Sequence, residues 1–160
     1  MKLEGLTVNF LGDSITNQGY YLYNLRSAFQ GKEEKCHVFN RGVAGNRAIM
    51  AQHILEDEIF WINPDYVVVC FGVNDLGIWL YDKFVPVTDE LLAKRKARDD
   101  EYLHANEILI DKFNERGIKT IIMSPYAVDE LLAESDAIYT EPDNNEKEDL
   151  IKQSFYKRKT

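Results

Sequence analysis

Short runs of apolar residues alternate along the chain with longer segments in which apolar residues recur at helical spacing. Four of the short runs have the length and apolar character of buried strands, and the run at 66–71 is the richest in β-branched residues. These runs do not alternate between apolar and polar positions, which is typical of parallel strands covered on both faces. The pattern therefore predicts strands at residues 6–11, 36–39, 66–71 and 118–123.

Helices are predicted between the strands. The spacing of apolar residues indicates helices over residues 20–29 and 46–60, and a third from about residue 93 to Arg116, where Gly117 is placed to end it. Asn46 is the expected N-cap of the second helix. The third helix should bury one stripe of residues, made of Leu103, Asn106, Ile110 and Phe113. Strands that alternate with helices predict an α/β fold with helices on both faces of a parallel sheet.

The last helical pattern has no strand after it. Leu150, Ile151 and Phe155 recur at helical spacing, and no further strand-like run follows them. A doubly wound domain normally returns to its sheet after such a helix. We therefore expect one domain over residues 1–160 that is truncated at its C-terminus and lacks a fifth strand. The strand at 118–123 would then be a sheet edge, through which a homo-oligomer could form.

Composition narrows the class of protein. The 160 residues suit one domain, and 19 Lys and Arg against 27 Asp and Glu give a net charge of −8. This acidic excess argues against nucleic-acid binding, which needs a basic face. No stretch approaches the ~20 apolar residues of a membrane-spanning helix. Both cysteines, Cys36 and Cys70, lie in apolar runs, and the N-terminus has no signal-peptide pattern, so a cytoplasmic location is expected.

Small and polar residues follow three of the predicted strands, in the segments Gly12–Ile15, Asn40–Asn46 and Gly72–Asp75. Each segment alone has an ordinary explanation, because Ser14 suits a helix cap, glycines suit turns, and Asn-Asp is a common turn dipeptide. In doubly wound sheets, however, ligands bind at the carboxyl ends of the strands. With a strand order of 2-1-3-4 all three segments would face one crevice, so their coincidence predicts a functional site.

The residues in these segments resemble a known family. The motifs Gly12-Asp13-Ser14-Ile15, Asn40-x-Gly42-x-x-Gly45 and Gly72-x-Asn74-Asp75 look like those of the SGNH, or GDSL-type, esterases and acylhydrolases, in order and spacing. The resemblance covers about the first 125 residues. It implies a flavodoxin-like three-layer α/β/α fold, and a reaction that uses neither a metal nor a cofactor.

The resemblance also implies roles for individual residues. Ser14 matches the nucleophile, and its own N–H, the N–H of Gly45 and the side-chain amide of Asn74 match the three donors of an oxyanion hole. Fixed donors of this kind stabilise the negative charge that develops on a carbonyl oxygen during acyl transfer. Asp13 and Asp75 look like residues that fix the loops by accepting backbone hydrogen bonds. The residues that bind the rest of the substrate are not identified.

The fourth motif of this family, Asp-x-x-His near the C-terminus, is absent from the chain. It would supply the base that activates the serine and the carboxylate that orients the base. The histidines are expected elsewhere: His37 in a strand, His53 within a helix, and His104, three residues after Glu101, on a solvated helix face. The resemblance therefore implies an esterase that is impaired in this 160-residue form.

Two classes of function stay open. The first is hydrolysis of a small carboxylic ester, such as an acetylated sugar, a lysophospholipid or a short-chain ester, through an acyl-serine. The second is a module that binds a small molecule or carbohydrate in the same crevice without reacting. A nucleotide or flavin domain is disfavoured, because the segment from Gly12 to Gly19 lacks the lysine of a P-loop and the glycine spacing of a Rossmann turn.

Two further segments bear on the choice of substrate, and a third charged segment does not. Residues 78–84 are rich in aromatics and could either wall an acyl or sugar pocket or pack over the sheet edge. Residues 129–149 hold nine acidic residues against Lys147 alone, and could disfavour anionic substrates or form a solvated loop. The basic residues at 94–98 are balanced by acidic ones at 99–101, which is typical of a helix surface.

Overall fold

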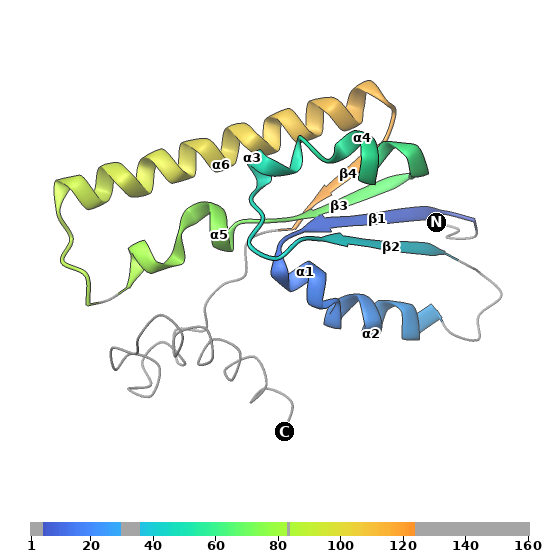
Figure 1. The fold of residues 1–160 in the computed structure, drawn as a ribbon, viewed down its shortest axis with the longest axis horizontal. Helices are drawn as coiled ribbons and strands as arrows, with labels where there is room; N and C mark the ends of the chain where they lie inside the picture. Colours follow the sequence, from blue (N-terminus) through green and yellow to red (C-terminus); the bar gives the residue numbers. More distant parts are fainter. Residues whose placement is uncertain (1–4, 30–35, 83, 124–160) are drawn as a thin grey trace. The chain divides into compact units, whose positions relative to one another are not determined.

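Four parallel strands form the sheet at the centre of the fold (Figure 1). The computed structural model describes residues 5–29, 36–82 and 84–123. The strands are β1 (Thr7–Gly12), β2 (His37–Gly42), β3 (Tyr66–Cys70) and β4 (Lys119–Ile122). Their order across the sheet is β2-β1-β3-β4, and all three pairings are parallel. The predicted α/β fold and the predicted order of these four strands are confirmed.

The register of the sheet brings three strand ends to one level. Gly12, the last residue of β1, lies opposite Gly42 of β2 on one side and Cys70 of β3 on the other. Because the strands are parallel, these are all carboxyl ends. The segments that follow β1, β2 and β3 therefore leave the sheet from the same edge.

Helices cover both faces of the sheet (Figure 1). One face carries α1 (Ser14–Gln18) and α2 (Tyr20–Phe29). The other face carries α3 (Ala48–Ala51), α4 (Leu55–Glu58) and α6 (Asp89–Glu115). The shorter elements are η1 (Phe60–Ile62), α5 (Val73–Leu76) and η2 (Ile78–Tyr81). The result is the three-layer α/β/α arrangement that the alternating pattern predicts.

The central strand β3 contributes to a core on each side of the sheet. Val67 and Val69 belong to the larger core, together with Leu109 of α6. Val68 belongs to the smaller core, where it packs in one cluster with Leu22 of α2. Successive strand residues point to opposite faces, so a strand that is buried on both faces must be apolar at every position. This explains the uninterrupted apolar run in the sequence.

The predicted helix over residues 46–60 is wrong as a single helix. The structure divides it into α3, α4 and η1, and His53 lies in the turn between the first two. Asn46 is not an N-cap: Arg47 takes that position, and Asn46 is buried. The Asn46 carbonyl instead accepts a hydrogen bond from the Asn74 side chain at 3.0 Å. A contact between distant loops therefore overrides the local cap preference.

The long helix α6 begins earlier than the periodicity predicts. Thr88 is its N-cap, and the Thr88 hydroxyl accepts a hydrogen bond from the Leu91 N–H at 3.2 Å. Gly117 follows the end of the helix with φ of +70°, a left-handed conformation that favours glycine. The predicted stop at Gly117 is confirmed.

The buried stripe of α6 differs from the predicted one. Ala105, Leu109 and Phe113 are each no more than 1% exposed, and their four-residue spacing places them on one helix face. The predicted stripe included Leu103 and Ile110 instead of Ala105 and Leu109. Leu103 is 61% exposed, so its place in the core is wrong. Periodicity alone misplaced the stripe because this helix carries apolar residues on more than one face.

Within the described residues, β4 pairs only with β3, and its Ile121 is 48% exposed. The predictions for the chain after Met123, which concern the missing fifth strand, the truncated end and the acidic residues 129–149, lie outside the described residues. The single domain over residues 1–160 also stays a prediction. No helix in the described part combines the length and the apolar character needed to cross a membrane.

Paired substitutions in α6 test which face is buried. We expect Leu109→Ala to lower the free energy of unfolding by about 2–5 kcal/mol, because it leaves a cavity in a fully buried position. Leu103→Ala removes the same atoms from an exposed position and should change it by less than about 0.5 kcal/mol. Urea denaturation followed by circular dichroism measures both. Similar losses in the two variants would contradict the observed helix face.

Candidate active site

Ser14 lies two residues after the end of β1, as the first residue of α1. Asp13 caps this helix, and Asp13 Oδ1 accepts a hydrogen bond from the Ile15 N–H at 2.9 Å. Gly12 permits the tight turn from strand to helix, because a Cβ there would overlap the Thr16 side chain and the Cys70 carbonyl. The serine is therefore placed by a glycine and an aspartate that precede it in the same motif.

The loop after β2 is fastened to α1. The Asn40 side chain donates a hydrogen bond to the Thr16 carbonyl at 2.8 Å, and its Oδ1 accepts one from the Gly42 N–H at 2.9 Å. The Val43 N–H donates to the Gly12 carbonyl at 3.0 Å. Gly42 must lack a side chain, since a Cβ would overlap the backbone of α1 at Asn17. Asn40 thus positions both the helix that carries Ser14 and the loop that carries Gly45.

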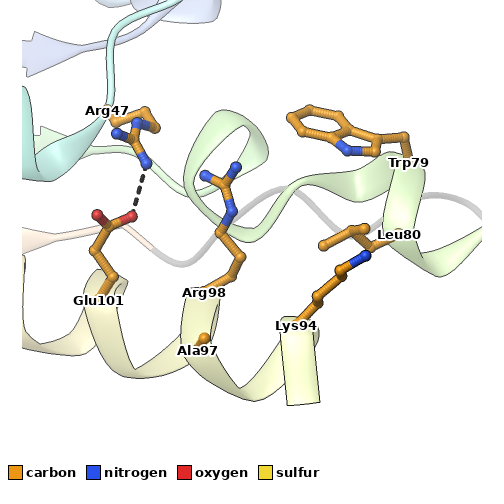
Figure 2. A pocket seen from close by; sticks show the side chains of 7 residues that line it. All are labelled: Arg47, Trp79, Leu80, Lys94, Ala97, Arg98 and Glu101. Atoms are coloured by element: carbon orange, nitrogen blue, oxygen red, sulfur yellow. Dashed lines mark hydrogen bonds and ion pairs between the residues drawn. The ribbon is translucent and has the colours of Figure 1, made fainter. Parts of the chain in front are cut away.

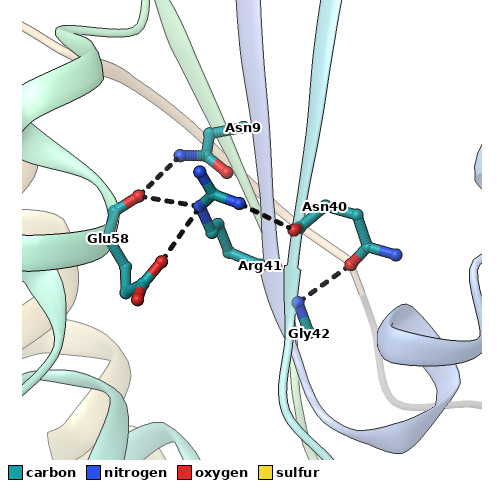
Figure 3. Close-up of polar contacts among 5 residues, drawn as sticks. All are labelled: Asn9, Asn40, Arg41, Gly42 and Glu58. Atoms are coloured by element: carbon teal, nitrogen blue, oxygen red, sulfur yellow. Dashed lines mark hydrogen bonds and ion pairs between the residues drawn. The ribbon is translucent and has the colours of Figure 1, made fainter.

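The base of this loop is also tied to the other face of the sheet (Figure 3). Arg41 Nε donates to the Glu58 carbonyl at 3.1 Å and pairs with the Glu58 carboxylate at 3.2 Å. The buried Asn9 donates to the same carbonyl at 3.5 Å. These contacts hold the end of β2 against α4, so the loop that follows starts from a fixed position.

The loop after β3 binds the loop after β2. Asn74 Nδ2 donates to the Asn46 carbonyl at 3.0 Å. Asp75 Oδ1 accepts from the Ala48 N–H at 2.7 Å, and Asp75 Oδ2 accepts from the Gly72 N–H at 3.1 Å. Asp75 therefore accepts two backbone hydrogen bonds and joins two loops that are distant in sequence.

Hydrogen-bond donors at this edge are left without acceptors. Within the described residues, neither the N–H of Ser14 nor the N–H of Gly45 donates a hydrogen bond. The Asn74 amide has two N–H donors and uses one of them for Asn46. Gly45 is exposed and has φ of +75°. The structure thus brings Ser14, Gly45 and Asn74 to one sheet edge, on loops that are bonded to each other. Their catalytic roles stay predictions.

Two carboxylates are buried beneath this edge. Asp13 and Asp75 are each 2% exposed. Burial is the main cause that raises the pKa of each above its ordinary value of 3.8, and the backbone hydrogen bonds they accept oppose the shift. The charge of Asp75 raises the pKa of Asp13 further. Holding the loops in place therefore costs electrostatic free energy.

None of the histidines is bonded to Ser14, whose side chain makes no hydrogen bond within the described residues. His37 begins β2, at the end of the strand opposite to Gly42, and is exposed. His53 is exposed in a turn rather than placed within a helix as predicted. His104 is exposed on α6, as predicted, with Nδ1 3.8 Å from Glu107. No base for Ser14 is present among them.

An open pocket of about 500 Å³ lies between η2 and α6 (Figure 2). Its lining residues are Arg47, Trp79, Leu80, Lys94, Ala97, Arg98 and Glu101. Sequence reasoning placed 94–101 on a plain helix surface, which is incomplete, and left two alternatives for the aromatic segment at 78–84. Arg47 was missed altogether. The one indication in the sequence that Arg47 belongs near the site is its position directly after the loop motif that ends at Asn46.

Across the residues that the structure describes, no three His, Cys, Asp or Glu side chains are grouped so that they could hold a metal ion.

The sequence matches the model of the GDSL-like lipase/acylhydrolase family over residues 10–154. This match spans most of the chain, and the protein belongs to that family. The family resemblance predicted from the three motifs is confirmed. No sequence among the curated proteins matches the chain significantly.

Solved structures with a similar fold include two kinds of enzyme. A gut microbial diltiazem-metabolizing enzyme matches with a TM-score of 0.67 and 24% identity, over 97% of this chain and 34% of that one. An acetyl xylan esterase matches with a TM-score of 0.61 and 24% identity, over 92% of this chain and 71% of that one. This chain therefore spans about a third of the first protein.

A third match is a catalytic mutant of the acetylxylan esterase Axe2 from Geobacillus stearothermophilus, in which an aspartate is replaced by alanine. Its TM-score is 0.60 at 20% identity, and the match covers 100% of this chain and 76% of that one. Other catalytic mutants of Axe2, which replace a serine or a histidine, match at the same TM-score. At these identities the matches establish the fold.

Substitution of Gly42 tests the close approach of β2 and α1. We expect Gly42→Ala to lower the free energy of unfolding by about 1–3 kcal/mol, because the added methyl group overlaps backbone that must then shift. The neighbouring Val43→Ala shortens a side chain that is 48% exposed, and should cost less than about 0.5 kcal/mol. Urea denaturation compares the two, and an unchanged stability of Gly42→Ala would rule out the close packing.

The raised pKa of Asp13 predicts a pH dependence of stability. As pH rises above the ordinary value of 3.8, Asp13 loses its proton in the unfolded chain before it does so in the folded protein, so its contribution to stability falls. Asp13→Asn keeps an oxygen for the Ile15 N–H but has no proton to lose. Relative to wild type, the variant should gain stability as pH rises above 3.8, until the raised pKa is passed. Urea denaturation across that pH range measures the difference, and a difference that does not change with pH would contradict the shift.

Proposed function

We propose that this protein is a serine esterase that cleaves a small carboxylic ester through an acyl-serine intermediate. One observation carries the proposal. Unpaired donors from Ser14, Gly45 and Asn74 lie at a single sheet edge, on loops joined by hydrogen bonds. Neutral donors fixed in this way stabilise a developing oxyanion without repelling a neutral ester. Membership of the GDSL-like lipase/acylhydrolase family supports the same chemistry.

The reaction would proceed in two stages. Attack of Ser14 Oγ on the carbonyl carbon forms a new C–O bond and moves an electron pair onto the carbonyl oxygen, which the donors bind. Collapse of this intermediate breaks the bond to the alcohol, which leaves with the proton lost by the serine. Water then attacks the acyl-serine, releases the acid and restores the hydroxyl.

The proton transfers of this reaction have no identified base in the protein. The family motif that supplies a histidine base is absent from the sequence, and no described histidine is bonded to Ser14. Members of a catalytic triad act as a unit, so loss of the base alone removes most of the rate. We therefore propose that the 160-residue form turns over slowly and relies on stabilisation of the oxyanion.

A sugar ester is the favoured substrate class. The solved structures of similar fold include acetyl xylan esterases, although the likeness is below 25% identity. The pocket that Arg47 lines also contains Trp79, which is 57% exposed and offers an aromatic surface to a sugar ring. Lysophospholipids and short-chain esters remain the alternatives, and relative rates on the three substrate types distinguish them.

Acetylation by p-nitrophenyl acetate tests the nucleophile. The nitrophenolate leaves without needing a proton, so an activated ester should acylate Ser14 even where no base is present, and slow hydrolysis should let acetyl-Ser14 accumulate. We expect mass spectrometry of digested protein to find the acetyl group on Ser14. Asn74→Ala should lower the rate of acetylation by about 100–1000-fold, the usual loss for one oxyanion donor.

Two controls make this result specific. Ser27 is exposed on α2 and provides the background reactivity of an ordinary serine. Ser14→Ala should abolish the acetylation, whereas Ser27→Ala should leave it unchanged. Acetyl groups spread equally over both serines, or absent from Ser14, would refute the proposed nucleophile.

A binding module without catalysis is the second candidate. The observation that favours it is the absence of a histidine bonded to Ser14. In that case a carbohydrate would bind equally well to the wild type and to Ser14→Ala, while Ser14 would react no faster than Ser27.

A further inference from the structure

We infer that the pocket between η2 and α6 binds a carboxylate-bearing sugar, next to the point where the ester reacts. This assignment deepens the proposed function and rests on it for the identity of the substrate. The pocket combines side chains from three separate parts of the chain. Trp79 comes from η2, Arg98 and Lys94 come from α6, and Arg47 comes from the loop before α3 (Figure 2).

Cationic side chains outnumber carboxylates in the lining of this pocket, although the whole chain carries −8. Lys94 is paired at 2.7 Å with Glu90, which does not line the pocket. Glu101 is already paired with Arg47 at 2.7 Å. Arg98 has no ion-pair partner among the described residues, and its guanidinium lies between Arg47 and Trp79 (Figure 2). An unpaired guanidinium has the charge and geometry to bind a carboxylate through two parallel hydrogen bonds.

The aromatic wall of the pocket is exposed but held in place. Arg95 binds the Leu80 carbonyl through Nε at 3.0 Å and through a terminal nitrogen at 2.7 Å. The same guanidinium stacks 4.5 Å from the centre of the Tyr81 ring. These contacts fix η2 on α6, so the exposed Trp79 indole does not depend on a ligand to hold its segment. An apolar face beside a cation suits a sugar ring that carries a carboxylate.

The pocket adjoins the candidate oxyanion donors through Arg47. The residue before it, Asn46, accepts the hydrogen bond from Asn74, and the residue after it, Ala48, donates to Asp75. A sugar held against Trp79 and Arg98 would therefore share the pocket with Arg47, which follows Gly45 by two residues. The pocket would thus bind an acidic sugar of the alcohol part of the ester and select substrates that contain one.

Titration with D-glucuronate, D-glucose and acetate tests the ligand class on the 160-residue chain. The chain has only two tryptophans, so ¹⁵N-labelled protein has two indole N–H resonances, and Trp61 serves as the internal reference. We expect D-glucuronate to shift the Trp79 resonance to saturation and leave that of Trp61 in place. D-Glucose lacks the charge and acetate lacks the ring, so each should bind at least about tenfold more weakly.

Two variants of α6 separate the pocket from general charge. Arg98→Gln should weaken D-glucuronate binding by about tenfold, because it removes the unpaired cation. Lys96→Gln removes a cation from the same helix that is paired with Asp100 outside the pocket, and should leave binding unchanged. Both positions are on a helix surface, and circular dichroism confirms that each variant is folded.

The outcomes distinguish this inference from the proposed function. The inference is overturned if D-glucose or acetate binds as tightly as D-glucuronate, or if the Trp79 resonance does not shift. It is also overturned if Arg98→Gln and Lys96→Gln weaken binding equally. Ser14→Ala should bind D-glucuronate as the wild type does. Failure of Ser14 to become acetylated, with D-glucuronate binding intact, would reject the esterase alone.

Discussion

The close packing of α1 against the ends of β1 and β2 is the constraint on which the rest of the site depends. It is possible only because Gly12 and Gly42, which face each other in the sheet register, have no side chains. The helix can then start one residue after Asp13 and present Ser14 at the sheet edge. With Asn40 bonded to both sides of this contact, the positions of serine and loop are set by one packed unit rather than by two independent loops.

The buried carboxylates at this edge lower local stability, and in return they fix the positions of the loops. Asp13 and Asp75 are almost fully enclosed, and burial raises the pKa of both. A carboxylate is nevertheless the acceptor that can serve two backbone N–H groups at once, as Asp75 does for Ala48 and Gly72. An apolar residue would leave those N–H groups buried without acceptors, at about 1–3 kcal/mol each. Asparagine, the neutral side chain of the same size, has one acceptor oxygen and cannot place a separate oxygen against each N–H as Asp75 does.

The sequence predicts the sheet well and the helices less well, for a physical reason. Strands such as β3 are buried on both faces, so their apolar run and the turn before it suffice to locate them. Helix boundaries depend on contacts made elsewhere, as the bond between Asn46 and Asn74 shows. The motif residues follow from their places after the strands, whereas the Arg47 and Trp79 pocket joins segments more than thirty residues apart and has no local pattern. Tertiary packing alone brings those side chains together.

The oxyanion donors and the catalytic base of a serine esterase come from different sequence motifs, and this sequence contains only the motifs of the donors. Its candidate donors follow strand ends between Gly12 and Asp75, and the packing of α1 and the hydrogen bonds between the loops hold them in place. The base belongs to a different motif, which the sequence does not contain. An oxyanion hole with substrate binding, but without an intact triad, still accelerates acyl transfer by about 10³–10⁴-fold over water in well-studied hydrolases. The proposed esterase would therefore polarise an ester carbonyl through its donors while transferring the acyl group slowly.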